Sequence, residues 1–194
     1  MPEYTIRPLT PALVEDYLAF FDHDAFCDNP EWQECYCAFF HYYSPSHAGE
    51  WNARTGAENR ASASELIRSG RKHGYLAYDG EKVVGWCHAA PRSALPLLRE
   101  TFCLAAEDEE ETGAVVCFIV AKTHRRRGIA RALLDAACEG FRAAGLAWAE
   151  AYPHPTQDTD AGNYHGPTSL YLGAGFRPVR EQGETLIVRK PLRP

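Results

Sequence analysis

The sequence AVVCFIVAKTHRRRGIARALLDAACEGF, residues 114–141, predicts a strand, a loop and a helix in succession. It begins with an unbroken apolar run, residues 115–120, that is rich in β-branched side chains and predicts a strand buried on both faces. An amphipathic helix is predicted next, because charged residues occupy one face and apolar residues the other. The apolar face repeats every four residues, at Ile129, Leu133, Ala137 and Phe141.

A cationic loop, residues 122–128, joins this strand to the helix and ends in Gly128. Backbone N–H groups at the start of a helix have no intrahelical acceptor, and the helix dipole adds partial positive charge there. The small residues Gly128 and Ala130 let a ligand approach the backbone closely. The loop therefore predicts a pyrophosphate cradle, with a solvated basic first turn as the alternative. It has neither the Gly-Lys-Ser/Thr end of a P-loop nor the three glycines of a dinucleotide-binding turn.

The loop sequence Arg125-x-x-Gly128-x-Ala130 resembles the Gln/Arg-x-x-Gly-x-Gly/Ala signature of the GNAT superfamily of acyl-CoA-dependent N-acetyltransferases. The resemblance implies that this loop binds the pyrophosphate of coenzyme A and that the preceding strand pairs with its pantetheine amides. The cofactor-binding residues it implies are Phe118, Ile119, Val120, Arg125, Arg126, Arg127, Gly128, Ile129 and Ala130. It also implies an α/β fold: a mixed, mostly antiparallel central sheet with a splayed pair of parallel strands, flanked by helices.

Length and composition favour a single domain. The chain has 194 residues, of which 45% are hydrophobic, enough for one sizeable core spanning 1–194. Within it we expect an N-terminal part with acceptor-side loops, a CoA-binding core, and a C-terminal loop, helix and strands, at residues 1–73, 74–152 and 153–194. A net charge of −6 argues against nucleic acid as a partner.

The cellular setting follows from what the sequence lacks. The N-terminus has no basic segment followed by an apolar one, and no apolar run approaches the length of a membrane span. The count of seven cysteines is odd, and most lie in apolar strings, as expected of thiols in a reducing compartment. We therefore expect a cytoplasmic protein with no membrane partner; a homodimer remains open.

The remaining elements are predicted from periodicity and turn signals. We expect an N-terminal strand, a helix capped by Thr10, a second helix, a hairpin turning at Asp79-Gly80, a strand after Gly145, and a late helix followed by two strands. Their ranges are 4–8, 10–21, 57–69, 74–89, 146–152, 168–174, 177–180 and 185–189. Residues 48–55 and 153–167 are expected to be loops, and residues 91–102 a short helix or loop.

Residues 31–43, EWQECYCAFFHYY, predict neither a helix nor a strand. Cys27, Cys35, Cys37 and His41 suit zinc, although a single residue between two thiolates matches structural zinc sites poorly. Packing is the better interpretation. In a GNAT-like fold this region helps to build the acceptor site, so Trp32, Tyr36 and Phe40 are candidates for the wall of a substrate pocket.

An amine attacks a thioester only when neutral, whereas a free alkylamine has a pKa of about 10.4, so a base is needed. Glu150 is the candidate, because burial in its otherwise apolar strand would raise its pKa. Strand alternation also allows Glu150 to face outward. Weaker candidates are Asp22, Asp24, His88 and His154, and a chain of water molecules would serve too.

A general acid is implied by the segment from Ser169 to Phe176, which resembles the GNAT segment where a tyrosine precedes Gly-Phe. The matching residue is Tyr171, whose hydroxyl would protonate the departing thiolate; an ordinary core aromatic is the alternative. A backbone N–H near Ile119 would hold the oxyanion.

The sequence therefore predicts transfer of an acetyl group from acetyl-CoA directly to the primary amine of a small molecule. Acidic loops at residues 22–28 and 158–160 favour a cationic acceptor. The substrate-binding candidates are Asp22, Asp24, Trp32, Tyr36, His88 and Tyr152, with no metal. The alternatives are a protein or peptide N-acetyltransferase, a non-catalytic acyl-CoA sensor, and a zinc-stabilised interaction module.

Overall fold

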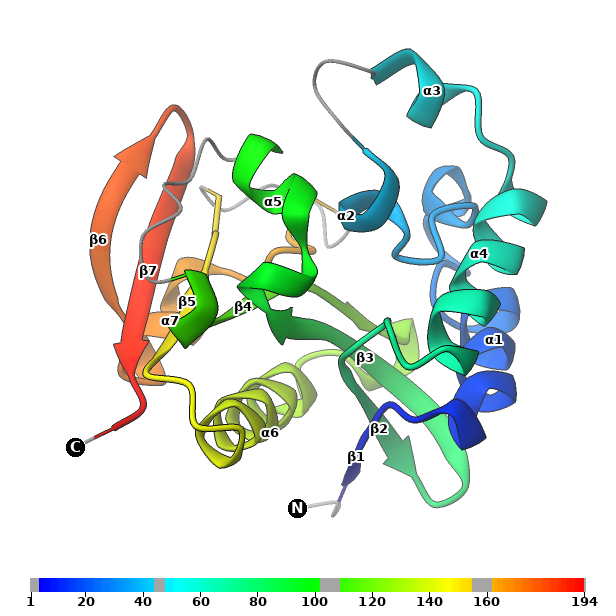
Figure 1. Ribbon diagram of the computed structural model, residues 1–194. Helices are drawn as coiled ribbons and strands as arrows, with labels where there is room; N and C mark the ends of the chain where they lie inside the picture. The colour runs from blue at the N-terminus through cyan, green and yellow to red at the C-terminus, as the bar shows by residue number, and fades with distance from the viewer. Residues whose placement is uncertain (1–3, 44–47, 102–108, 155–161, 194) are drawn as a thin grey trace.

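The computed structural model describes residues 4–43, 48–101, 109–154 and 162–193. Seven strands of these residues form one sheet in the order β1-β2-β3-β4-β5-β7-β6, in which β4 and β5 are parallel and all other neighbours antiparallel (Figure 1). This confirms the expected mixed, mostly antiparallel sheet. The strands are β1 (Thr5–Pro8), β2 (Tyr75–Asp79), β3 (Lys82–Pro91), β4 (Thr112–Val120), β5 (Trp148–Ala151), β6 (Arg177–Gln182) and β7 (Thr185–Pro191).

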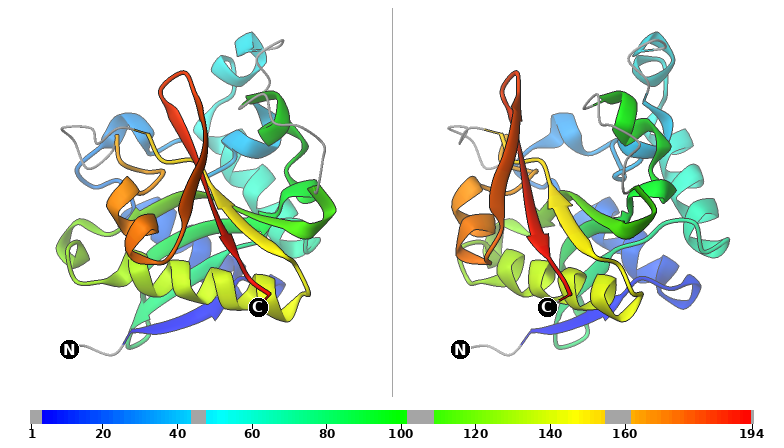
Figure 2. Two further views of the ribbon diagram at one scale, coloured as in Figure 1. Left: turned by 90° about the vertical axis from the view of Figure 1, so that its left-hand side faces the viewer. Right: turned by 60° about the vertical axis from the view of Figure 1, so that its left-hand side comes forward.

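Helices cover both faces of this sheet. The helices are α1 (Val14–His23), α2 (Phe39–Tyr42), α3 (Ala48–Asn52), α4 (Gly56–Arg68), α5 (Pro96–Thr101), α6 (Ile129–Ala143) and α7 (Thr168–Gly173). One face packs on α6, which contacts strands β1 to β5, while α1 and α4 lie together on the opposite side (Figure 2). The sheet thus separates two apolar layers, one around Trp86 and Tyr17 and the other around Phe118 and Leu133.

The helix predicted from the central sequence is α6. All four residues of its expected apolar face are buried, as the four-residue repeat requires. Gly128 precedes α6 with a φ of 85°, and Gly145 follows it with a φ of 79°. The N–H of Gly145 donates to the Arg142 carbonyl, which closes the helix at its C-terminal end.

The parallel strands β4 and β5 separate partway along their length. Their register pairs Thr112 with Trp148 and ends where Val115 meets Ala151. Strand β4 continues to Val120, so residues 116–120 have β3 on one side and no described strand on the other. This free edge of β4 is the splay expected from the sequence, and it positions the candidate site.

The N-terminal third differs from the sequence expectations. A short 3₁₀ turn, Pro11–Leu13, precedes α1, and the Thr10 side chain makes no capping hydrogen bond. Residues 48–52, expected in a loop, form α3. The next helix, α4, begins one residue earlier than predicted because Thr55 and Glu58 form a capping box.

Candidate functional site

A cavity of about 530 Å³ lies between the free edge of β4 and the N-terminal third of the chain. The sheet side contributes residues 117–120, together with Arg125 and Tyr164. The opposite side is mostly aromatic, with Phe26, Trp32, Phe39, Phe40 and Trp51. The cavity therefore brings the predicted pantetheine-binding strand together with Trp32, one of the predicted acceptor residues.

The backbone groups of β4 alternate between the two sides of the strand. Phe118 donates its N–H to the Tyr164 carbonyl at 2.6 Å, so its backbone faces the opening rather than β3. Ile119, the next residue, is paired with Trp86 of β3 and turns its N–H the other way. Of the strand residues predicted to bind the cofactor, Phe118 and Val120 face the splay and Ile119 does not.

Tyr171 lies beside this edge. Its ring centroid is 6.3 Å from that of Phe118, and its hydroxyl donates to the His165 carbonyl at 2.6 Å. Gly166 lies beneath both rings with a φ of 81°, where a Cβ atom would approach Tyr171 to 3.1 Å and Phe118 to 3.3 Å. Burial raises the pKa of Tyr171 well above its usual value, so the hydroxyl is protonated at neutral pH.

The loop before α6 has the properties of an anion cradle. A Cβ atom at Gly128 would meet nothing within 4 Å, so the space above this backbone is open. Within the described part of the chain, the N–H groups of Gly128, Ile129 and Ala130 have no acceptor. Arg126 and Arg127, which directly precede them in the chain, are exposed and add positive charge. Unsatisfied donors at the positive end of a helix dipole suit a pyrophosphate, so these residues fit the CoA group predicted for them.

Arg125 binds the protein itself. Its Nε donates to the Val120 carbonyl at 3.1 Å, and its two Nη atoms donate to the Asp28 carboxylate at 2.7 and 2.9 Å. The hydrogen bonds from Arg125 hold the pKa of Asp28 below its usual value. Arg125 thus fastens the loop around Asp28 to the end of β4 and closes one side of the cavity.

Glu150, the predicted base, faces inward with an exposed fraction of 1%. Its carboxylate contacts Arg92 at 3.2 Å and also pairs with Arg189. Tyr152, a predicted substrate residue, donates its hydroxyl to the same carboxylate at 2.5 Å. The described wall of the cavity includes neither Glu150 nor Tyr152. The carboxylate predicted to be the base in an otherwise apolar strand is therefore surrounded by partners of its own.

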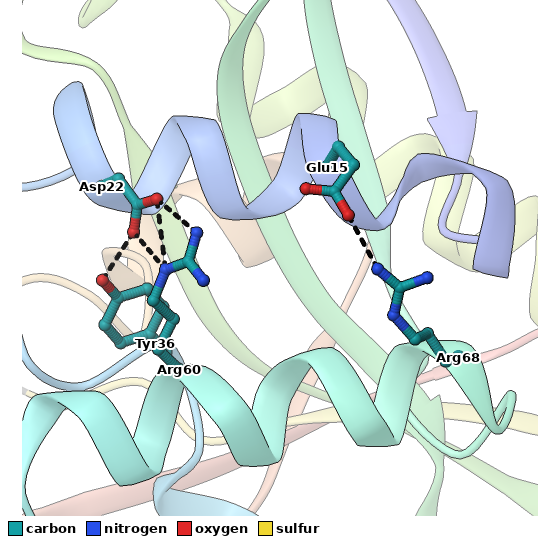
Figure 3. Close-up of polar contacts among 5 residues, drawn as sticks. All are labelled: Glu15, Asp22, Tyr36, Arg60 and Arg68. Atoms are coloured by element: carbon teal, nitrogen blue, oxygen red, sulfur yellow. Dashed lines mark hydrogen bonds and ion pairs between the residues drawn. The ribbon is translucent and has the colours of Figure 1, made fainter.

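Two predicted acceptor residues, Asp22 and Tyr36, connect helices instead. Figure 3 shows Asp22 at the end of α1 receiving both the Tyr36 hydroxyl, at 2.7 Å, and the Arg60 guanidinium of α4, at 2.8 Å. The hydrogen bond from Arg60 lowers the pKa of Asp22. Asp24 likewise pairs with Lys82 at 2.7 Å. The charges expected to attract a cationic acceptor at residues 22–28 are thus compensated within the protein, and residues 158–160 lie outside the described residues.

Two carboxylates at the cavity replace them. Glu31 and Glu34 line it and are exposed, and among the described residues neither carboxylate has a hydrogen-bond or ion-pair partner. Sequence reasoning missed both because they lie in the aromatic segment whose structure it could not assign. The sequence signal that could have identified them is that both are acidic and lie within two residues of Trp32, a predicted acceptor residue.

A cysteine–histidine contact was also missed. The Cys37 sulfur lies 3.2 Å from Nδ1 of His88, a predicted acceptor residue whose side chain is fully buried in β3. Cys37 lines the cavity and His88 lies behind it. The two residues are 51 positions apart, so no local pattern could have paired them.

The described residues contain no cluster of metal-ligating side chains that would support the zinc alternative. Across the residues that the structure describes, no group of three or more His, Cys, Asp or Glu side chains is placed to hold a metal ion. His154, one of the weaker candidate bases, is half-buried, and its ring centroid lies 4.6 Å from that of His165.

Comparison with known proteins identifies the class to which this fold and cleft belong. The family model described as "Acetyltransferase (GNAT) family" matches residues 30–163. The chain belongs to the GNAT family of acetyltransferases. A comparison with curated protein sequences finds no match. In the described residues, no helix is both long and apolar enough to cross a membrane.

Solved structures share the fold over nearly the whole chain. The PaiA N-acetyltransferase of Thermoplasma acidophilum, in complex with coenzyme A, has a TM-score of 0.55 at 15% identity and covers 97% of this chain and 99% of its own. An N-acetyltransferase of Staphylococcus aureus Mu50 has a TM-score of 0.57 at 14% identity, covering 98% and 99%. YncA of Salmonella typhimurium, with its cofactor acetyl-CoA, has a TM-score of 0.53 at 15% identity, covering 98% and 94%.

Proposed function

We propose that the protein transfers the acetyl group of acetyl-CoA directly to the primary amine of a small cationic molecule. The observation that carries this proposal is the composition of one cavity. Its sheet side carries the free edge of β4, which leads to the cradle at Gly128, and its opposite side is aromatic with unpaired carboxylates at Glu31 and Glu34. Donor and acceptor would therefore meet within the same space.

Acetyl-CoA would supply an acetyl group already activated as a thioester. The backbone N–H groups of Gly128, Ile129 and Ala130 would hold its pyrophosphate, and Arg126 and Arg127 would add positive charge. Phe118 and Val120 would present their backbone groups to the pantetheine arm. The structure favours Phe118 over Ile119 as the donor to the thioester oxygen, because the Phe118 N–H faces the opening.

Tyr171 is the proposed general acid. Its ring lies beside that of Phe118, and its hydroxyl, which donates to the His165 carbonyl, is protonated at neutral pH. Once acetyl-CoA occupies the cavity, this hydroxyl would give a proton to the leaving thiolate and recover one from solvent. The Glu150 carboxylate, held by Arg92 and Arg189, would stabilise the fold. The role of general base that the sequence predicted for Glu150 is therefore left to another residue.

Glu31 and Glu34 support a cationic acceptor. Amines are protonated at neutral pH, and a second positive charge on the acceptor would be attracted by carboxylates that have no partner in the described structure. The aromatic wall would bind the carbon frame of a small molecule. A peptide or protein amine is the alternative within the same chemistry.

The test is acetyl-CoA titration by calorimetry, followed by thiol release with a panel of polyamine-like, aminoglycoside-like, neutral and peptide amines. We expect acetyl-CoA to bind and the cationic small molecules to react fastest.

Replacing Glu31 and Glu34 by Gln should raise the KM of a cationic acceptor by roughly three- to tenfold, since exposed charges contribute up to about 1 kcal/mol each. Glu81→Gln, an exposed carboxylate at the β2–β3 turn, is the matched control. Fastest reaction with a peptide would overturn the acceptor class, and failure to bind acetyl-CoA would overturn the function.

A further inference from the structure

Cys37 lies on the wall of the cavity in a strained backbone conformation. Tyr36 and Cys37 have φ angles of 42° and 47°, a left-handed region that costs a residue other than glycine about 1–2 kcal/mol. Two buried side chains hold these residues by their carbonyls: the Tyr17 hydroxyl donates to Tyr36 at 2.7 Å, and Lys72 Nζ donates to Cys37 at 2.7 Å. The fold therefore fixes Cys37 in a conformation that it would not adopt by itself.

His88 is placed to donate a hydrogen bond to the Cys37 sulfur. The Nδ1 atom lies 3.2 Å from that sulfur, while Nε2 is buried with no hydrogen-bond partner in the described structure. Burial lowers the pKa of His88, which favours the neutral imidazole. A neutral ring whose Nε2 has no acceptor nearby carries its proton on Nδ1, where the sulfur can accept it.

The surroundings of Cys37 favour its thiolate. Burial raises the pKa of the Cys37 thiol, but the hydrogen bond with Cys117, the charge interaction and hydrogen bond with His88, and the positive charge of Lys72 outweigh burial and hold it well below its usual value. The hydrogen bond with Cys37 and burial raise the pKa of Cys117, so Cys117 keeps its proton. The other titratable groups that interact with this pair include Lys72, His88, Cys35, Cys87, Tyr17, Tyr164 and His165, and the ring of His41 stacks on that of His88.

We propose that Cys37 is the general base of the acyl transfer, and that its thiolate takes a proton from the ammonium group of the acceptor. This rests on the function proposed above, which puts the acceptor in the cavity that Cys37 lines. One N–H bond of the ammonium breaks, an S–H bond forms, and the electron pair stays on nitrogen. The amine is then neutral and nucleophilic, and the thiol later returns its proton to solvent. His88 and Lys72 act through Cys37 as positioning residues.

Other acidic groups are less well placed for this step. Glu31 and Glu34 are exposed, so an acceptor ammonium near them would keep its proton. Glu150 is paired with Arg92 and Arg189 and does not belong to the described cavity wall. Cys37 has an exposed fraction of 3% and faces the same space as Phe118. Because Cys37 is almost fully buried, a base at this position acts largely out of contact with bulk solvent.

The first test is the ultraviolet absorbance of thiolate, titrated against pH in the wild type, Cys37→Ser and His88→Gln proteins. We expect a thiolate at neutral pH in the wild type that Cys37→Ser abolishes. His88→Gln should move its titration to higher pH. Cys138→Ser is the matched control, because Cys138 also has an exposed fraction of 3% but lies in α6, on the other face of the sheet. Absence of a Cys37 thiolate at neutral pH would overturn the proposal.

The second test is kinetic and uses the best amine from the panel. Cys37→Ser should lower kcat/KM at neutral pH by about 10²–10⁴ while leaving acetyl-CoA affinity unchanged. The deficit should shrink as the pH approaches about 10, where the free amine no longer needs a base. Full activity in Cys37→Ser would refute the base role while leaving the acetyltransferase function in place. Failure of the wild type to bind acetyl-CoA would instead refute the function, and the base role with it.

A third measurement separates a base from a nucleophile. The wild type is incubated with acetyl-CoA without an acceptor, and the intact protein is then weighed by mass spectrometry under acidic conditions. A base leaves the mass unchanged. An added acetyl group that disappears in Cys37→Ser would show that the sulfur attacks the thioester itself, and it would overturn the proposal.

Discussion

Phe118 donates its backbone N–H to the carbonyl of Tyr164 at 2.6 Å, across the opening where β4 and β5 separate. His165 reinforces this contact, because its Nδ1 lies 2.9 Å from the Val116 carbonyl. Its own carbonyl accepts the Tyr171 hydroxyl. One short segment therefore uses the proposed donor of the thioester site and the proposed general acid at the same time.

We expect acetyl-CoA to compete with this segment. If the thioester oxygen takes the Phe118 N–H, the Tyr164 carbonyl must give it up, and residues 162–167 lose part of their attachment to β4. Hydrogen–deuterium exchange should then show faster exchange in peptides covering these residues when acetyl-CoA is added. Peptides from β1 and β2, at the far end of the sheet, serve as the control. Slower exchange in residues 162–167 would mean that the cofactor binds without displacing Tyr164.

Replacing Tyr171 by Phe should separate catalysis from packing. We expect kcat to fall by about 10²–10⁴ because the general acid is lost, with acetyl-CoA affinity retained. The lost hydrogen bond to His165 should also lower the free energy of unfolding by about 1 kcal/mol. Steady-state kinetics and urea unfolding measure the two effects.

Tyr78→Phe is the matched control for Tyr171. Tyr78 is also buried, and its hydroxyl also makes one hydrogen bond, to Asp16 at 2.8 Å, but its ring belongs to the layer around Trp86. The control should show a similar loss of stability and unchanged kcat. Equal activity in the two variants would reduce Tyr171 to a core aromatic.

Gly128→Ala tests the cradle. The positive φ of Gly128 makes any Cβ atom costly by about 1 kcal/mol, and that atom would project into the open space where the pyrophosphate is proposed to bind. We expect a roughly tenfold or greater rise in the acetyl-CoA dissociation constant, equivalent to about 1.4 kcal/mol or more. Gly145→Ala at the other end of α6 has the same strain and the same open space. Its affinity should match the wild type; equal weakening in both variants would place the cofactor elsewhere.

The sheet and α6 could be predicted because their side chains repeat with the period of the structure they form. The run at residues 115–120 and the four-residue spacing from Ile129 are local signals, and the structure confirms both. The division of the chain into residues 1–73, 74–152 and 153–194 stays a prediction. In the segment of residues 31–43, helix is confined to a short turn and to α2. Some of its aromatic rings pack on one another, as Phe39 does on Phe40, and others on distant residues, as Tyr36 does on Phe21.

The partners of charged residues could not be predicted, because they lie far away in the sequence. Asp22 and Asp28 appeared free to bind a cation, but Arg60 and Arg125, 38 and 97 positions away, neutralise them. Glu150 lies in the strand predicted for it, yet its arginine partners come from two other parts of the chain. A sequence shows which groups carry charge, while the fold decides which of them remain available to a substrate.

Buried histidines should make the fold sensitive to acid. Burial lowers the pKa of His165 to about 3 and that of His41 to about 2, from an ordinary value of 6.5. Below pH 6.5 the unfolded chain therefore binds protons that the folded protein does not, and the free energy of unfolding falls as the pH falls. Each buried histidine should lower the free energy of unfolding by about 1 kcal/mol between pH 6.5 and 5.5.

Urea unfolding at these two pH values, with His165→Asn beside the wild type, measures the effect. Asparagine keeps a donor for the Val116 carbonyl but does not titrate, so this variant should lose about 1 kcal/mol less than the wild type over that interval. His23→Asn, at an exposed position, should behave as the wild type does. An equal pH dependence in His165→Asn and the wild type would show that His165 takes up its proton without unfolding.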